Sequence, residues 1–246
     1  MMKISISLLL VVASLAFAQD LDGRVLSVGS DTTYPPFEFI DDSGEVVGFD
    51  VDIVNAVCDA VNCVAEFQTT AWDGIFPALA AGEFDMVASG VSITPERDEI
   101  VDFSDPYLTV SQSITVRVED EDYSLDDFTG GELILAAQTG TTNANLAEEL
   151  VGRDRLQLYD TFNAAVLALL NGDVDGVIID GTAADAFVQQ YAGDLVVNIG
   201  GLSSDPLGLV FQEGDELVDA FNAGLAAIRE DGTYDDIVAK WFTPSE

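Results

Sequence analysis

The 246-residue sequence contains no histidine. Histidine is the usual partner of serine and cysteine nucleophiles and a common metal ligand, so its absence excludes Ser–His and Cys–His catalysis and histidine metal sites. Carboxylates are abundant, but no pair has a spacing that singles it out for acid–base chemistry. We therefore expect no catalytic residue, no metal site and no cofactor, and a protein that is not an enzyme.

Positive charge is also scarce, because 8 lysines and arginines face 45 acidic residues, for a net charge of −37. A nucleic-acid partner is excluded, since nothing supplies a basic face for the phosphate backbone. Self-repulsion among the carboxylates destabilises a fold in dilute salt and is screened when the Debye length falls to about 3 Å at 1 M salt. The acidic residues are interpreted as a solvated surface suited to saline surroundings.

Only one long apolar run is present, and it lies near the start of the chain. Lys3 precedes an almost uncharged stretch from Ile4 to Phe17, and Ala18 ends a run of small residues suited to signal peptidase. This pattern predicts a secretory signal peptide at residues 1–18, too short to span a membrane. No cysteine follows the cleavage site directly, so we expect a soluble, exported protein without a lipid anchor.

Cysteine occurs only twice, as Cys58 and Cys63, on either side of the end of a helix that begins near Asp50. An oxidising compartment permits a disulfide between them. The alternative is a pair of buried thiols.

Short β-branched runs alternate with helical patterns along the chain. Five runs predict buried parallel strands: Val25–Gly29, Val64–Gln68, Asp85–Ala88, Leu133–Ala137 and Gly176–Ile179. Helices are expected at 50–60, 74–81, 143–150, 162–170, 182–191, 215–229 and 234–241, and a hairpin turn at 41–44. The pattern runs twice, first to about Tyr107 and then, from a strand at 113–118, to about Gly200. It predicts an α/β fold with helices on both sheet faces.

The stretch from Gly90 to Tyr107, GVSITPERDEIVDFSDPY, contains an arginine that local stability does not explain. Thr94-Pro95 predicts a helix start, with a hydroxyl N-cap and proline at the first helical position. Arg97 then lies in the first turn, where a cation opposes the helix dipole. Either it pairs with a neighbouring acidic residue at the surface, or it grips a ligand carboxylate bidentately.

This stretch resembles the signature of the extracellular solute-binding proteins that bind polar amino acids for ABC importers, such as those for lysine/arginine/ornithine, histidine and glutamine. Further matches follow in the family's order after residue 24: Tyr34-Pro35-Pro36-Phe37, Gly48–Asp52, Trp72–Leu79, Gly140-Thr141-Thr142, Asp175–Asp180 and Asp231–Tyr234. Each match is weak alone, and seven in order are specific.

The resemblance implies a two-lobed type II periplasmic-binding-protein fold, with two strand crossovers between the lobes and the ligand in the interlobe cleft. Lobe 1 is expected at 24–113 plus 206–246, and lobe 2 at 114–205. The implied function is capture of a polar, basic L-amino acid by lobe closure and its delivery, by a monomer, to an ABC transporter permease. Relatives carry a similarly placed cysteine pair with slightly longer spacing, which favours the disulfide.

The α-amino acid backbone needs partners for both of its charges. We expect Arg97 to hold the carboxylate together with Thr141 and Thr142, which lie at a strand-to-helix turn with free N–H groups. Asp180 ends an apolar strand, where open α/β sheets place ligand groups, and the resemblance assigns it the ligand ammonium. The alternative for Thr141, Thr142 and Asp180 is that they only cap the helices that follow them. The resemblance adds first-lobe contacts from Ser89, Gly90 and Ser92.

The residues expected to determine which ligand side chain is bound are Asp31, Tyr34, Trp72 and Gln138. By resemblance, Tyr34 and Trp72 sandwich the side chain and Asp31 reaches its far end. Gln138 departs from the apolar residue or lysine found in relatives, which leaves the ligand's identity open. Two other functions stay open: a periplasmic cyclohexadienyl or arogenate dehydratase, with Asp31 or Asp180 as the acid, and a ligand-sensing subunit of a receptor.

Overall fold

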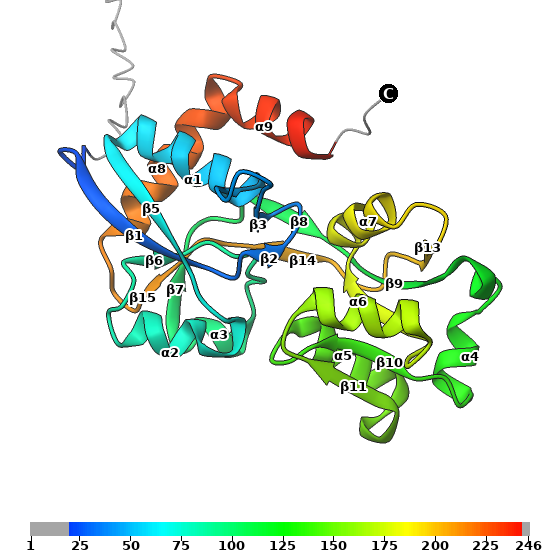
Figure 1. Ribbon diagram of the computed structural model, residues 1–246. Helices are drawn as coiled ribbons and strands as arrows, with labels where there is room; N and C mark the ends of the chain where they lie inside the picture. The colour runs from blue at the N-terminus through cyan, green and yellow to red at the C-terminus, as the bar shows by residue number, and fades with distance from the viewer. Residues whose placement is uncertain (1–19, 243–246) are drawn as a thin grey trace, which may run out of the picture.

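The computed structural model describes residues 20–242. The chain forms two α/β lobes that lie side by side (Figure 1). The predicted signal peptide lies outside the described residues. Within them, no helix combines the length and the apolar content needed to cross a membrane.

The first lobe is built on a five-stranded sheet whose strands come from both ends of the chain. Their order is β5 (Cys63–Thr69), β1 (Arg24–Ser30), β6 (Met86–Val87), β15 (Val210–Gln212) and β7 (Val101–Phe103). Helices α1 (Phe49–Val61), α8 (Leu217–Glu230) and α9 (Thr233–Phe242) pack together on one side, while η1 (Trp72–Gly74), α2 (Ile75–Ala80) and α3 (Pro95–Asp98) lie on the other (Figure 1). Leu26 and Val28 of β1 are fully buried, as expected for a sheet covered on both faces.

The second lobe repeats this plan. Its strands follow the order β11 (Leu156–Tyr159), β10 (Leu135–Gln138), β12 (Gly176–Asp180), β9 (Gln112–Arg117) and β13 (Leu195–Ile199). Its helices are η2 (Val118–Asp120), α4 (Leu125–Gly130), α5 (Thr142–Val151), η3 (Arg153–Arg155), α6 (Phe162–Asn171) and α7 (Gly181–Gln190). Consecutive residues of β12 point to opposite faces: Val177 packs with Ala165 of α6 and Ala183 of α7, and Ile178 packs with Ala147 of α5.

Two extended strands connect the lobes. β8 (Leu108–Val110) leads out of the first lobe, and β14 (Asp205–Leu207) pairs with it antiparallel on the way back. After β14 the chain enters β15 and completes the first sheet. The two expected crossovers and the α/β fold are therefore confirmed. The exact lobe boundaries at 113/114 and 205/206 stay a prediction; they fall within β9 and β14.

A small sheet and a disulfide complete the first lobe. β2 (Thr33–Tyr34), β3 (Glu38–Ile40) and β4 (Val46–Val47) form the predicted hairpin region with the turn at 41–44. Cys58 on α1 and Cys63 at the start of β5 are bonded to each other, so the disulfide prediction is confirmed and the thiol alternative is wrong.

Some sequence predictions were wrong in detail. β5 is an edge strand and not a buried one, since Val64 is 50% exposed. The predicted parallel strand at Gly176–Ile179 is confirmed for the pairing of β12 with β10, whereas β12 pairs antiparallel with β9, which enters from the crossover. The sequence pattern missed β11 and β13, which are short edge strands with few fully buried side chains.

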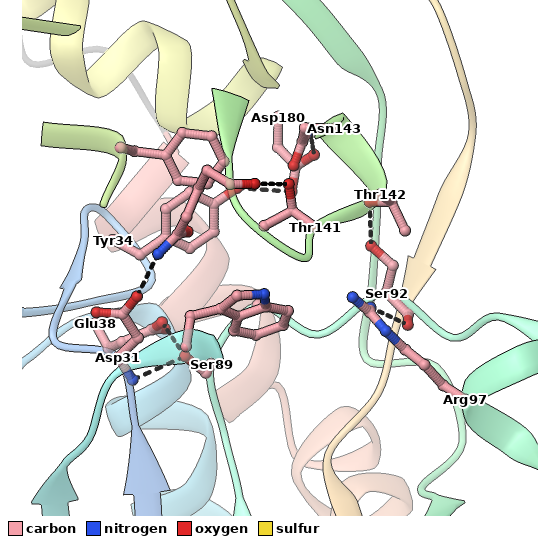
Figure 2. A pocket seen from close by; sticks show the side chains of 14 residues that line it. Asp31, Tyr34, Glu38, Ser89, Ser92, Arg97, Thr141, Thr142, Asn143 and Asp180 are labelled. Carbon is pink, nitrogen blue, oxygen red and sulfur yellow. Dashed lines mark hydrogen bonds between the residues drawn. The ribbon is translucent and has the colours of Figure 1, made fainter. Parts of the chain in front are cut away.

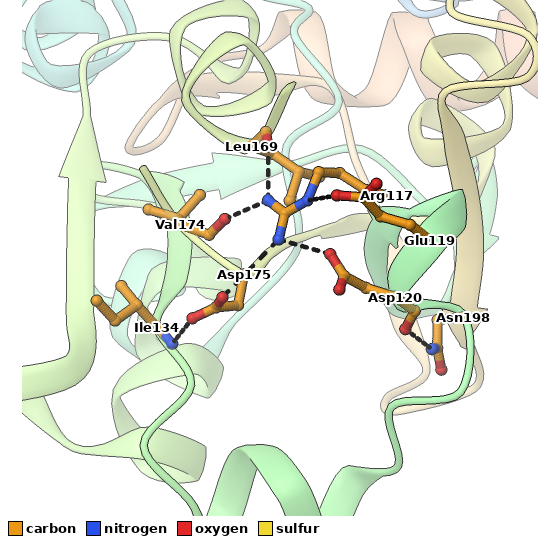
Figure 3. A network of polar contacts seen from close by, with 8 residues as sticks. All are labelled: Arg117, Glu119, Asp120, Ile134, Leu169, Val174, Asp175 and Asn198. Atoms are coloured by element: carbon orange, nitrogen blue, oxygen red, sulfur yellow. Dashed lines mark hydrogen bonds and ion pairs between the residues drawn. The ribbon is translucent and has the colours of Figure 1, made fainter. Parts of the chain in front are cut away.

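Arg117 is the centre of a network of polar contacts in the second lobe (Figure 3). Its Nη1 donates to the carbonyl oxygens of Leu169 and Val174, both at 2.8 Å, and its Nη2 lies 2.5 Å from an Asp120 carboxylate oxygen. Arg117 thereby ties β9 to the end of α6 and to the turn before β12. Its acceptors satisfy the guanidinium, which favours a structural role.

Few carboxylates have such a partner. Among the described residues, only Arg24, Arg117 and Lys240 form ion pairs with acidic side chains. The net charge of −37 is therefore largely uncompensated at the surface.

We expect the urea midpoint of unfolding to rise as NaCl increases from about 0.1 to 1 M, over which the Debye length falls from about 10 to 3 Å. A variant with Asp42, Asp122 and Asp154 changed to asparagine, all exposed, serves as the control and is expected to need less salt for the same midpoint. A midpoint that does not change with salt contradicts the interpretation.

Candidate functional site

A cavity with about 330 Å³ of empty space lies between the lobes (Figure 2). Every ligand-contact residue predicted from the sequence lines it: Asp31, Tyr34, Trp72, Ser89, Gly90, Ser92, Arg97, Gln138, Thr141, Thr142 and Asp180. Three further lining residues were not predicted: Glu38, Asn143 and Phe162.

Arg97 is the cation of this cavity. Thr94 caps α3 as predicted, and its Oγ1 accepts a hydrogen bond from the Arg97 N–H at 3.2 Å. The guanidinium donates through Nη1 to the Ser92 carbonyl at 2.8 Å and lies 5.2 Å from the centre of the Trp72 ring. Among the described residues no carboxylate forms an ion pair with Arg97, so the surface-pair interpretation is wrong.

Burial lowers the pKa of Arg97 to about 10, with nearby Asp180 opposing the shift. The guanidinium remains charged at neutral pH. The guanidinium also has donors left over, because its one side-chain hydrogen bond among the described residues uses Nη1. A largely buried cation with free donors can bind an anion.

The start of α5 lines the same cavity from the second lobe. Thr141 is the N-cap: its Oγ1 accepts from the Ala144 N–H at 3.1 Å and donates to the Gln138 carbonyl at 2.7 Å. Its hydroxyl is thus used for capping, as the alternative interpretation stated. Thr142 Oγ1 lies 3.4 Å from Ser92 Oγ of the first lobe. The free amides of the first helical turn can therefore share an anion with Arg97 across the cleft.

Asp180 lies at the end of β12 with its side chain 2% exposed. Oδ1 accepts from Asn143 Nδ2 at 3.0 Å, and Oδ2 accepts from the Tyr34 hydroxyl at 2.7 Å (Figure 2). Burial raises the pKa of this carboxyl to about 6, and the two hydrogen bonds limit the rise. The side chain makes no capping bond to α7, so capping does not explain it.

Asp31 and Glu38 form an acidic end of the cavity (Figure 2). Asp31 accepts from the Thr33 hydroxyl at 2.8 Å and from Gln138 Nε2 at 2.7 Å. Glu38 Oε1 accepts from the Ser89 hydroxyl at 2.7 Å, whereas its Oε2 is buried without a partner. Burial, with the charge of Asp50 adding to it, raises the pKa of Glu38 well above its usual value.

Asp50 does not line the cavity but bonds to Gly90, which does. It accepts from the Gly90 N–H and from the Tyr107 hydroxyl, all at 2.8 Å, and burial raises its pKa to about 7. Gly90 has a positive φ of 53°, and a Cβ there would lie 2.8 Å from the Tyr34 ring. Only glycine fits this close approach. Despite the acidic side chains nearby, no group of three or more metal-binding side chains occurs within residues 20–242.

The aromatic residues are arranged differently from the implied sandwich. The Tyr34 ring stacks on Phe37 and on Phe162, with both centroid distances 5.2 Å. Both of its faces are covered, so stacking of a ligand on Tyr34 requires Phe162 to move. Trp72 lies edge-on to Phe76 and under Arg97. A ligand sandwich between Tyr34 and Trp72 stays a prediction.

The three missed residues carry weak sequence signals. Glu38 follows directly after Tyr34-Pro35-Pro36-Phe37 and is a charge inside an apolar hairpin strand, which is a reason to ask what it faces. Asn143 lies two residues after the predicted N-cap Thr141. Phe162 is indistinguishable from a core residue by pattern, because it starts an apolar helix.

Comparisons with known proteins agree with this architecture. The family model of the bacterial extracellular solute-binding proteins, family 3, matches residues 26–244. A probable histidine-binding protein of Neisseria gonorrhoeae is 35% identical over 225 residues, which cover 89% of this chain and 84% of that protein.

Two solved structures are similar throughout. An ancestral arginine-binding protein bound to arginine superposes with a TM-score of 0.84 at 36% identity, covering 90% of this chain and 99% of that chain. An ancestral amino-acid-binding protein, a precursor of cyclohexadienyl dehydratase, gives a TM-score of 0.82 at 36% identity, covering 89% and 95%. The chain belongs to the bacterial extracellular solute-binding proteins, family 3.

Proposed function

We propose that this protein captures a polar L-amino acid with a basic side chain and delivers it to an ABC transporter permease. The expected order of ligands is arginine, lysine or ornithine first, then histidine and glutamine. The similarity to a probable histidine-binding protein and to an ancestral arginine-binding protein supports this ligand class. We further propose export through the signal peptide at 1–18 and action as a monomer in the periplasm.

The observation that carries the proposal is the separation of charges within one buried cleft. Arg97 and the start of α5 form an anion site, and Asp180 lies in the same cavity as a carboxylate for an ammonium. An α-amino acid carries both charges on one carbon and satisfies both groups together. Asp31 and Glu38 then receive the far end of the ligand, where a cation can pair with the Asp31 carboxylate, which no basic residue of the described chain pairs with.

Lobe closure follows from this division of contacts. Arg97, Ser89, Asp31 and Glu38 belong to the first lobe, and Asp180, Thr142 and Asn143 to the second. A ligand that touches both sets has its full complement of contacts only in the closed form. Binding therefore shifts the population towards closure, which is the signal a transporter can recognise.

Arg97→Ala and Asp180→Ala are each expected to weaken binding of every amino acid by about 2–5 kcal/mol, because each leaves a ligand charge buried without its partner. Isothermal calorimetry with the twenty amino acids plus ornithine and citrulline measures this loss. Arg153→Ala and Asp173→Ala, at exposed positions outside the cavity, are the matched controls. If either anchor variant keeps the parental affinity, that residue does not bind the ligand.

Affinity is expected to fall below about pH 6. Only the ionised form of Asp180 pairs with the ligand ammonium, and its pKa in the free protein is about 6. At lower pH the carboxyl must release a proton before pairing, so the Kd rises by up to about tenfold per pH unit. The steepest part of this dependence is expected to vanish in Asp180→Asn, which binds more weakly but does not titrate. A Kd that is constant from pH 4.5 to 8 rules the pairing out.

We also propose that the protein has no dehydratase activity. Asp180 can hold a proton near pH 6, and a similar ancestral protein is a precursor of cyclohexadienyl dehydratase, so the test is needed. Incubation with prephenate or arogenate is expected to give phenylpyruvate or phenylalanine at the spontaneous rate only. Formation above that rate, abolished in Asp180→Asn, establishes the enzyme instead.

A further inference from the structure

Two aromatic rings form a corner around the Arg97 guanidinium. The central carbon of this group lies 5.2 Å from the centre of the Trp72 ring and 5.3 Å from the centre of the Phe76 ring. The two rings are in edge-to-face contact, with centroids 5.7 Å apart and planes at 81°. Both guanidinium distances lie within the roughly 6 Å over which a ring face attracts a cation. The corner therefore holds the cation from two directions.

The local sequence explains how the corner forms. Trp72 begins η1, and this 3₁₀ turn runs directly into α2, which contains Phe76. Residues four positions apart lie on the same face of a helix, so both rings can contact one side chain. Trp72 lines the cavity, whereas Phe76 does not. Any effect of Phe76 on a bound ligand must therefore pass through the residues that it contacts, Arg97 and Trp72.

The corner competes with acidic neighbours for the guanidinium. Glu96, Asp98 and Glu99 are exposed and adjoin Arg97 in the sequence. Each could draw the guanidinium out to the surface, yet none of these three carboxylates, all within the described chain, forms an ion pair with it. The side chain lies instead against the two rings, with Nη1 donating to the Ser92 carbonyl at 2.8 Å.

An aromatic ring suits this task because it attracts a cation without neutralising it. A carboxylate beside Arg97 would offset its charge and occupy its N–H groups, so a ligand carboxylate would have to displace that partner. A ring face attracts the cation through its quadrupole and carries no formal charge. Arg97 thus keeps its charge and its remaining donors at the cavity wall. Holding the side chain in place before binding also lowers the entropy cost of binding.

We propose that Phe76 is a positioning residue: with Trp72 it holds the Arg97 guanidinium at the cavity, still charged and ready for a ligand carboxylate. This deepens the proposed amino-acid binding and rests on it. Phe76 itself does not touch the ligand. Without its ring, Arg97 is free to pair with Glu96 or another exposed carboxylate, and the anion site then loses its cation for part of the time.

The experiment is calorimetry of L-arginine and L-argininamide, in which a neutral amide replaces the α-carboxylate, with the wild type, Phe76→Leu and Phe76→Tyr. Phe76→Leu removes the ring and keeps an apolar side chain. Its Kd for arginine is expected to rise by about 3- to 30-fold, the range for the loss of one cation–π contact. Argininamide has no carboxylate, so its Kd is expected to change much less. The ratio of the argininamide Kd to the arginine Kd therefore falls, and Phe76→Tyr, which keeps a ring, restores it.

Phe103→Leu is the matched control. Phe103 is half-buried against the same hydrophobic cluster as Phe76 and does not line the cavity. Within the described chain, the cation–π contacts of Arg97 involve Trp72 and Phe76 but not Phe103. This variant is expected to leave the ratio unchanged. Thermal unfolding checks that each variant is folded, and Phe76→Met replaces Phe76→Leu if the latter does not fold.

The outcomes separate this inference from the proposed function. Equal weakening of both ligands in Phe76→Leu means that the ring acts on the cleft as a whole, for instance through Trp72, and overturns the positioning role. An unchanged arginine Kd in Phe76→Leu overturns it too, and in both cases amino-acid binding stands. If the wild type binds another amino acid but not arginine, that amino acid and its amide form the pair. A wild type that binds no amino acid overturns both the proposed function and this inference.

Discussion

The cleft depends on charges that are buried apart from each other. Arg97 is largely buried without a carboxylate partner, and Asp31 and Asp180 are buried without a cation. Burying a charge costs free energy unless something compensates it. In the absence of a ligand, neutral donors compensate partly: Tyr34 and Asn143 at Asp180, and Gln138 at Asp31. A zwitterion with a basic side chain compensates all of these groups at once.

The same neutral donors couple binding to the movement of the lobes. Tyr34 and Asp31 come from the first lobe, whereas their partners Asp180 and Gln138 come from the second. These hydrogen bonds across the cleft by themselves stabilise the closed form. A ligand that replaces them must form stronger contacts with the two lobes than they do. The raised pKa values of Glu38, Asp50 and Asp180 follow from the same incomplete compensation.

The acidic surface and the acidic cleft have different physical roles. Surface carboxylates are hydrated and screened by salt, so each one contributes little. Carboxylates in the cleft are shielded from water, and salt screens them much less. A basic ligand can thus bind selectively at Asp31 even in a protein that carries dozens of exposed carboxylates.

The sequence by itself determined the α/β alternation, the N-capped start of α3 and the positions of the main helices, because these depend on local patterns and turn residues. Its motifs also identified Arg97, Asp180 and Asp31 as members of one site. Only the tertiary structure decided that Val64 is exposed, that Phe162 covers Tyr34, that Glu38 faces the cavity and that Gln138 donates to Asp31. Each of these depends on segments far apart in the chain, such as Asp31 and Gln138, and no local periodicity records which side chain lies opposite another across a cleft.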